Sequence, residues 1–186
     1  MSRIACLGWG SLVWDPRELP IRRKWFDDGP IVSVEFVRQS KDGRLTLVLH
    51  GSGTPVRSLW AMMETSDLAT AKSALQQREG VDNPDSIKTW VADAASPTHV
   101  ADLPFWAKAH GIDAVIWTAL RPKFQFKPKA QSEYKPPSPK QAVAYLQTLR
   151  GAQRDLAEQY IRKTPKQVDT AFRRLFEATL GWTAQE

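Results

Sequence analysis

The chain of 186 residues has few of the residue types that build disulfide frameworks or metal centres. Its one cysteine, Cys6, lies in an apolar run and excludes an internal disulfide, so we predict a buried thiol in a reducing compartment. The three histidines, His50, His99 and His110, show no ligand spacing, and we predict no metal site. No apolar run reaches about 18 residues and no signal peptide is evident. We therefore expect a cytoplasmic protein with no membrane span or membrane partner.

The composition is that of a globular protein with a surplus of positive charge. Hydrophobic residues make up 42% of the chain and charged residues 25%, enough for one domain with a core. Eight tryptophans against three tyrosines indicate a thick core or an aromatic-walled cavity. The net charge of +6 can attract nucleic acid, a membrane surface or an anionic metabolite. Nucleic-acid binding is disfavoured and ranks below the enzymatic and small-ligand functions considered below, because prolines interrupt the densest basic stretch, residues 121–140, and no nucleic-acid module is recognisable.

The first part of the chain, to about residue 120, is predicted to form mostly strands. Residues 4–12 predict a buried strand that runs straight into a glycine turn. Residues 31–39 alternate apolar and polar side chains, and Asp42-Gly43 joins them to 45–49 as a hairpin. The pattern also predicts strands at 56–63, 87–91 and 112–120, and helices from Ser66 or Asp67 to Gly80 and over 103–110.

The last third is predicted to be helical after a long loop. Residues 121–139 hold several prolines and little periodicity, which is typical of a loop. Ser138-Pro139 and Thr164-Pro165 are each a capping residue followed by proline, so a helix is predicted to begin at each. Gly151 separates the first two helices, and an amphipathic stripe over 168–179 predicts core packing.

The segment Gly8-Trp9-Gly10-Ser11-Leu12 is the first candidate for a ligand site. Two glycines at a strand end let the backbone turn sharply and approach a ligand closely. Successive N–H groups in such a turn can hold an oxygen anion, while Ser11 adds a hydroxyl and Trp9 a flat wall. Such turns are more often structural, so these residues alone leave both interpretations open.

Glu79 is the second candidate, in the last turn of its predicted helix. The negative end of a helix dipole disfavours the charged form of a carboxyl group, which suits it to proton transfer near neutrality. The alternative, which the residue alone favours, is a surface charge paired with Arg78 or a lysine.

Taken together, these segments resemble the γ-glutamylcyclotransferase superfamily, above all its ChaC-type glutathione-degrading branch. L-G-W-G-S-L-V-W at 7–14 resembles the family's strand ending in Y-G-S. Residues 34–39 are similar to its second strand with an Arg-containing end, and 53–61 to its next glycine-then-strand segment. L-Q-Q-R-E-G at 75–80 is similar to the segment with the catalytic glutamate. The resemblance covers roughly the first 80 residues.

The resemblance implies an α+β fold. Residues 1–120 would form a small mixed β-barrel with flanking helices, and residues 121–186 a loop and helical C-terminal extension packed on the same domain. It further implies an enzyme of the lyase or acyltransferase type that releases 5-oxoproline from a γ-glutamyl peptide or amine, with no metal or cofactor. Glu79 would be the general acid and base. The substrate and oxyanion would be held by Gly8, Trp9, Gly10, Ser11 and Leu12, with Arg38 as a further binding residue.

Two departures from the family pattern keep another function open. Trp9 stands where the family usually has Tyr, so a phenol hydroxyl is missing there. Ser58 stands where the strand usually has Gly, which predicts a narrower cavity. Both fit a different substrate, or a non-catalytic protein that binds a small ligand or a partner on the same scaffold. The oligomeric state is left open.

Overall fold

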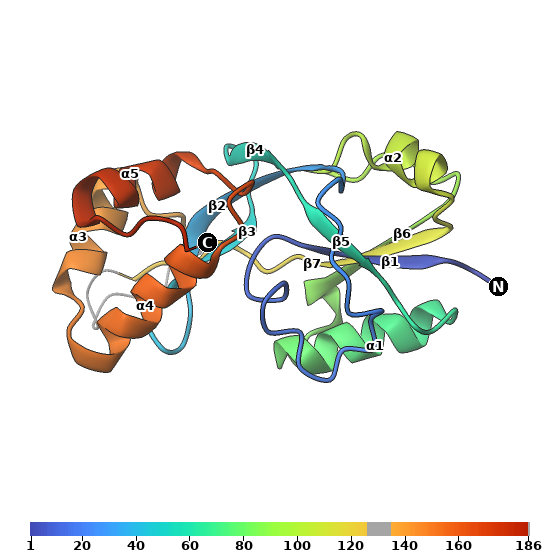
Figure 1. Ribbon diagram of the computed structural model, residues 1–186, viewed down its shortest axis with the longest axis horizontal. Helices are drawn as coiled ribbons and strands as arrows, with labels where there is room; N and C mark the ends of the chain where they lie inside the picture. The colour runs from blue at the N-terminus through green and yellow to red at the C-terminus, as the bar shows by residue number, and fades with distance from the viewer. Residues whose placement is uncertain (126–134, 186) are drawn as a thin grey trace.

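The computed structural model describes residues 1–125 and 135–185, which form a mixed α+β fold. The strands are β1 (Ile4–Gly8), β2 (Ile31–Gln39), β3 (Leu45–Leu49), β4 (Thr54–Arg57), β5 (Leu59–Met62), β6 (Ile87–Val91) and β7 (Ala114–Thr118). The helices are α1 (Leu68–Glu79), the short 3-10 helix η1 (Pro84–Ser86), α2 (Leu103–His110), α3 (Pro139–Thr148), α4 (Gly151–Lys163) and α5 (Ala171–Leu180). Figure 1 shows β1, β5, β6 and β7 between α1 and α2, and β2 and β3 beside α3, α4 and α5.

The first sheet has the strand order β5-β1-β7-β6, with β1 antiparallel to β5 and parallel to β7. All five residues of β1 are buried, as predicted. Because side chains alternate across a strand, Ile4 and Cys6 pack with Leu75 of α1, while Ala5 and Leu7 join the core on the α2 side. Burial raises the pKa of the Cys6 thiol, which stays protonated. Because both faces of β1 are covered by other residues, only its C-terminal end, at Leu7 and Gly8, lines a cavity.

Helix α1 has the boundaries that its capping residues predict. The Asp67 side chain accepts a hydrogen bond from Thr70 N at 2.7 Å and starts the helix. Gly80 adopts the left-handed conformation with φ 63° and ends it. This end places Glu79, the last helical residue, beside the C-terminal end of β1.

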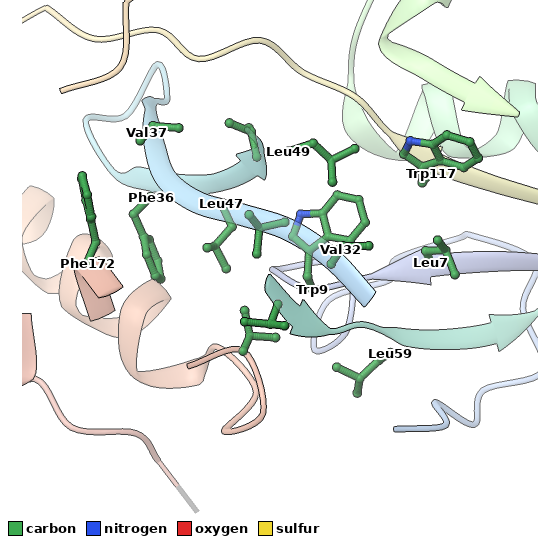
Figure 2. Packing of buried hydrophobic residues seen from close by; sticks show 14 of the residues in the cluster. Leu7, Trp9, Val32, Phe36, Val37, Leu47, Leu49, Leu59, Trp117 and Phe172 are labelled. Carbon is green, nitrogen blue, oxygen red and sulfur yellow. The ribbon is translucent and has the colours of Figure 1, made fainter. Parts of the chain in front are cut away.

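The second sheet has the order β3-β2-β4, and its hairpin confirms the predicted turn. Gly43 supplies the positive φ of 86° that the turn between β2 and β3 requires. Phe36 of β2 meets Phe176 of α5 edge-on at 5.6 Å and Tyr160 of α4 at 6.3 Å. Figure 2 shows Phe36 and Leu47 in the core that faces these helices. The C-terminal helices therefore cover this sheet and supply side chains to the space in front of it.

The predicted strand 56–63 is wrong in one respect, because it divides at Ser58 between the two sheets. β4 pairs with β2, whereas β5 pairs with β1. Ser58 is fully buried, and its hydroxyl and backbone N–H both donate to Pro30 O, at 2.7 and 3.1 Å. These bonds take Ser58 out of both ladders. The chain changes sheet there, so the described strands form two sheets and do not close into the expected barrel.

The helix expected to begin at Thr164-Pro165 is present as α5, but it begins at Ala171, later than predicted. Thr164 ends α4 instead, and its hydroxyl donates to Tyr160 O at 2.9 Å. The following helix starts later, where Thr170 caps α5 through Arg173 N. A proline just after a helix end is as well accommodated as one in a first turn.

The helix predicted to start at Ser138-Pro139 is confirmed, with a complete capping box. The middle of the predicted loop 121–139, and with it much of the basic stretch 121–140, lies outside the described residues. Within the described parts of the chain, no helix is long and apolar enough to cross a membrane.

Candidate functional site

The turn after β1 is held by two backbone hydrogen bonds. Val13 N donates to Gly10 O at 3.0 Å, and Asp15 N donates to Ser11 O at 2.8 Å. The N–H groups of Gly10 and Leu12 have no acceptor among residues 1–125 and 135–185. A fixed turn with unused N–H donors can bind an oxygen anion.

Both glycines of the turn are required by close packing. A Cβ on Gly8 would lie 2.9 Å from the Trp25 ring. A Cβ on Gly10 would lie 2.6 Å from the hydroxyl oxygen of Tyr160, on α4. The backbone φ of Gly10 is not positive, so the lack of space alone excludes a side chain there. The glycine pair thus lets a phenol from the C-terminal helices reach the turn.

We expect Gly10→Ala to destabilise the protein by about 1–3 kcal/mol in wild-type background and by clearly less in Tyr160→Phe. Removing the hydroxyl leaves Tyr160 Cζ as the next atom, at 3.6 Å, which is ordinary contact. Urea unfolding of the two single variants and the double variant measures the coupling. Additive effects would contradict the close approach of Tyr160 to Gly10.

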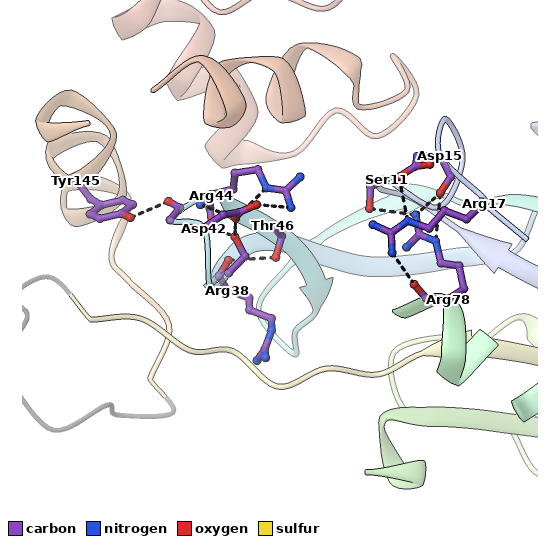
Figure 3. A network of polar contacts seen from close by, with 11 residues as sticks. Ser11, Asp15, Arg17, Arg38, Asp42, Arg44, Thr46, Arg78 and Tyr145 are labelled. Atoms are coloured by element: carbon purple, nitrogen blue, oxygen red, sulfur yellow. Dashed lines mark hydrogen bonds and ion pairs between the residues drawn. The ribbon is translucent and has the colours of Figure 1, made fainter. Parts of the chain in front are cut away.

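Arg78 and Glu79 form a mostly buried ion pair beside the turn. Arg78 Nη1 lies 2.8 Å from Glu79 Oε1, and the side chains are 6% and 15% exposed. The pairing with Arg78 that the sequence left open does occur, but Glu79 is not a surface charge. Arg78 also donates to the carbonyl oxygen of Asp15 and contacts Ser11 Oγ at 3.5 Å. Figure 3 shows Arg78 between Ser11 and Asp15.

One cavity of about 570 Å³ joins these groups. It is lined by every residue predicted for the site: Gly8, Trp9, Gly10, Ser11, Leu12, Arg38 and Glu79. These residues come from β1, its turn, β2 and the end of α1, so the fold brings together segments more than 60 residues apart. Ser58 does not line this cavity, so the predicted narrowing by Ser58 is wrong. Its side chain is directed to Pro30 instead.

The opposite wall comes from β2, β3 and α4. Arg38 Nη1 donates to Arg121 O at 2.7 Å, and Arg44 pairs with Asp42 at 2.7 Å. Figure 3 shows the two side chains leaving the β2–β3 hairpin on opposite sides, although both residues line the cavity. Arg44 also lies over the Tyr160 ring, 5.5 Å from its centroid. The wall therefore carries basic groups anchored on the sheet.

Tyr160 is a lining residue that no sequence pattern had marked as part of the site. Its hydroxyl accepts from Leu47 N at 3.4 Å, and no described residue accepts its proton. Burial, with Glu79 adding to the effect, raises the pKa of Tyr160 to about 12. The phenol is therefore neutral near pH 7 and is a hydrogen-bond donor at the cavity.

The cavity has a strong positive bias. Five cations and two carboxylates line it, a formal surplus of three positive charges. They are Arg17, Arg38, Arg44, Arg78 and Lys163 against Asp15 and Glu79. A cleft with one dominant sign of charge concentrates ligands of the opposite sign. The arrangement fits a small anionic ligand, with Glu79 as the mostly buried carboxylate available for proton transfer.

Comparison with known proteins gives no family. No protein-family model matches the sequence, and neither the curated proteins nor the solved structures contain a significant match. Among residues 1–125 and 135–185, no group of three or more His, Cys, Asp or Glu side chains is placed to hold a metal ion. The function is therefore argued from the cavity.

Proposed function

We propose that the protein is a γ-glutamylcyclotransferase-type enzyme that converts a γ-glutamyl peptide or amine to 5-oxoproline and a free amine. The observation that carries the proposal is the shared cavity of Glu79 and the Gly8–Leu12 turn. A mostly buried carboxylate and two free backbone N–H donors, those of Gly10 and Leu12, are the two kinds of group that an intramolecular acyl transfer needs. The positive charge of the cavity complements the α-carboxylate of a γ-glutamyl group.

In the first step, Glu79 takes a proton from the substrate α-ammonium. The freed amine attacks its own γ-carbonyl carbon, and a C–N bond closes the five-membered ring. The γ-oxygen becomes an oxyanion, for which the N–H groups of Gly10 and Leu12 are the available donors. The attack is intramolecular, so holding the substrate in a folded shape supplies much of the rate.

In the second step, the oxyanion collapses and the original amide C–N bond breaks. Glu79 returns its proton to the departing nitrogen, and the ring nitrogen passes its second proton to the released amine, which leaves as an ammonium ion. The carboxylate is thereby regenerated and no co-reactant is consumed. Arg78 holds Glu79 through its 2.8 Å contact and fixes the direction of the carboxylate. Arg38 is the candidate for the substrate α-carboxylate on the opposite wall.

The Arg78–Glu79 pair also favours a second candidate, a non-catalytic protein that binds a small anion. In that case Arg78 engages Oε1 of Glu79 permanently, and the cavity is a charged receptor without proton transfer. Binding without turnover separates the two functions.

The test incubates the purified full chain with glutathione and a panel of γ-glutamyl amines, and follows 5-oxoproline by mass spectrometry. We expect 5-oxoproline and the free amine in equal amounts from at least one compound. The matched control is the same compound acetylated on its α-nitrogen, which has no free amine to attack and should give no product. If no compound of the panel gives 5-oxoproline, the proposed enzymatic function is wrong, and the non-catalytic anion-binding function is the one that is left.

A further inference from the structure

A second cavity, of about 460 Å³, lies on the other side of the chain that follows β7. Successive side chains of an extended chain point to opposite sides, and here they divide between two cavities. Thr118 lines the first cavity, whereas Trp117, Ala119 and Arg121 line the second. Leu120 borders both. The volume is within the usual range of small-molecule sites, about 300–1,000 Å³.

The second cavity has an apolar lining that is held in place by backbone bonds. Its apolar side chains are Leu49, Pro97, Trp117, Ala119, Leu120 and Pro122. The wall at residues 97–99 is tied down because Val100 N donates to Pro97 O and Ser33 N donates to His99 O, both at 3.2 Å. On the other side, Arg38 holds the carbonyl of Arg121. The cavity is therefore formed before any ligand arrives.

Trp117 gives this cavity an unused donor. The residue is 3% exposed, and its indole N–H has no acceptor among the described residues. Among the described residues, one unpaired indole nitrogen, that of Trp25, is completely buried. The unpaired nitrogen of Trp117 is not completely buried, so part of its surface is accessible to solvent. Trp117 lines the second cavity and not the first, and we infer that the second cavity is the space that its N–H reaches. Figure 2 shows its indole beside the residues of the core.

The charged side chains around Trp117 are basic. Lys88 is the direct cross-strand neighbour of Trp117 in the β6–β7 ladder, so the two side chains leave the sheet on the same face. Arg121 lines the same cavity, and no carboxylate of a described residue does. An indole donor, two cations and an apolar lining together complement an acid group attached to an apolar body.

We propose that this second cavity binds a small carboxylate with a flat apolar body. The carboxylate accepts from Trp117 Nε1 beside Lys88 and Arg121, and the body lies against the leucines and prolines. This site is separate from the cavity of Glu79, and the proposal stands whether or not the chain forms 5-oxoproline.

The test titrates 2-naphthoate into the 15N-labelled full chain and follows the indole N–H signals by NMR. The Trp117 signal is identified by its loss in Trp117→Phe. We expect that signal to move, with a dissociation constant of roughly 1 mM or below for a ligand of this size. The neutral 2-naphthalenemethanol and inorganic phosphate, each of which has half of the required chemistry, should bind at least 10-fold more weakly.

Three variants separate the site from general attraction to a basic protein. Trp117→Phe keeps the ring but removes the donor, and we expect binding about 10-fold weaker. Arg121→Ala, at an exposed position, should weaken binding several-fold and reduce its salt dependence. Lys108→Ala, an exposed cation of α2 that lines neither cavity, should change nothing. An unmoved Trp117 signal, equal binding of the alcohol, or wild-type affinity in Arg121→Ala would each overturn the proposal.

Discussion

Glu79→Gln is expected to lower the rate of 5-oxoproline formation by about 10²–10⁴-fold, because the substrate ammonium loses the base that deprotonates it. The amide keeps an oxygen to accept from Arg78 Nη1, so the contact that orders the end of α1 is preserved. Stability should fall by about 1–3 kcal/mol, because the buried Arg78 cation loses its counter charge, although Gln fills the same volume. The loss should appear in kcat, whereas KM should stay within a few-fold of wild type.

The matched control for this prediction is Glu64→Gln. Glu64 is exposed after β5 and does not line the cavity, so the same chemical change there should leave the rate unchanged. The informative measurement is steady-state kinetics on all three proteins, with urea unfolding to show that each is folded. A Glu79→Gln protein that turns over at the wild-type rate would remove Glu79 from the mechanism. Equal loss in both variants would point to an effect of net charge alone.

The elements that the sequence predicted well are those whose ends are set by capping residues or turn glycines close by in the chain. Asp67 and Gly80 set the ends of α1 by hydrogen bonds within one turn of the helix. Gly43 sets the hairpin because the turn needs a positive φ. β1 is predicted by a short apolar run that leads straight into a glycine turn, which favours a buried strand. In each case the deciding interaction lies within a few residues of the signal.

The predictions that failed depend on contacts between distant segments. Nothing near Ser58 marks a change of sheet, because the bonds that cause it come from Pro30, 28 residues earlier. Pro165 is compatible with either end of a helix, and the choice follows from how Thr170 and α5 meet β2. The barrel implied by resemblance fails for the first of these reasons: β4 and β5 join different sheets.

The residues of the candidate site also divide into those with a local sequence signal and those placed by contacts between distant segments. The glycine turn and Glu79 were found because each has a sequence signal, and the fold places both at one cavity. Tyr160 was missed because its position on α4 reads as one buried residue among several on that helix. Its role depends on an approach to Gly10, 150 residues earlier in the chain, that only the packing of α4 against β2 and β3 creates. For the C-terminal helices, the sequence pattern predicts which side chains are buried in the core. It does not predict which of them reach the cavity.

Glu35 carries the largest stability effect that we expect, because it joins β2 to the start of α5. The carboxylate is 4% exposed and accepts from four donors. Oε1 accepts from Phe36 N at 3.0 Å and from Thr170 Oγ1 at 2.6 Å. Oε2 accepts from Thr54 Oγ1 at 3.1 Å and from Phe172 N at 3.4 Å. With Thr54 and Thr170 it satisfies the first backbone donors of α5, where a negative charge also favours the helix dipole.

Glu35→Ala should therefore lower the free energy of unfolding by about 3 kcal/mol, since it leaves these buried donors unpaired and an empty space between sheet and helix. Glu35→Gln should lower the free energy of unfolding by less than Glu35→Ala. Its amide oxygen can still accept hydrogen bonds, although its NH₂ group then faces other donors. The control is Glu64→Ala, an exposed carboxylate that should change stability by about 0.5 kcal/mol or less. Urea unfolding at neutral pH, read by tryptophan fluorescence, measures all three. A loss below about 1 kcal/mol for Glu35→Ala would mean that α5 does not depend on β2 for its N-terminal cap. The packing of Phe36 on Phe176 would then hold the two together without the carboxylate.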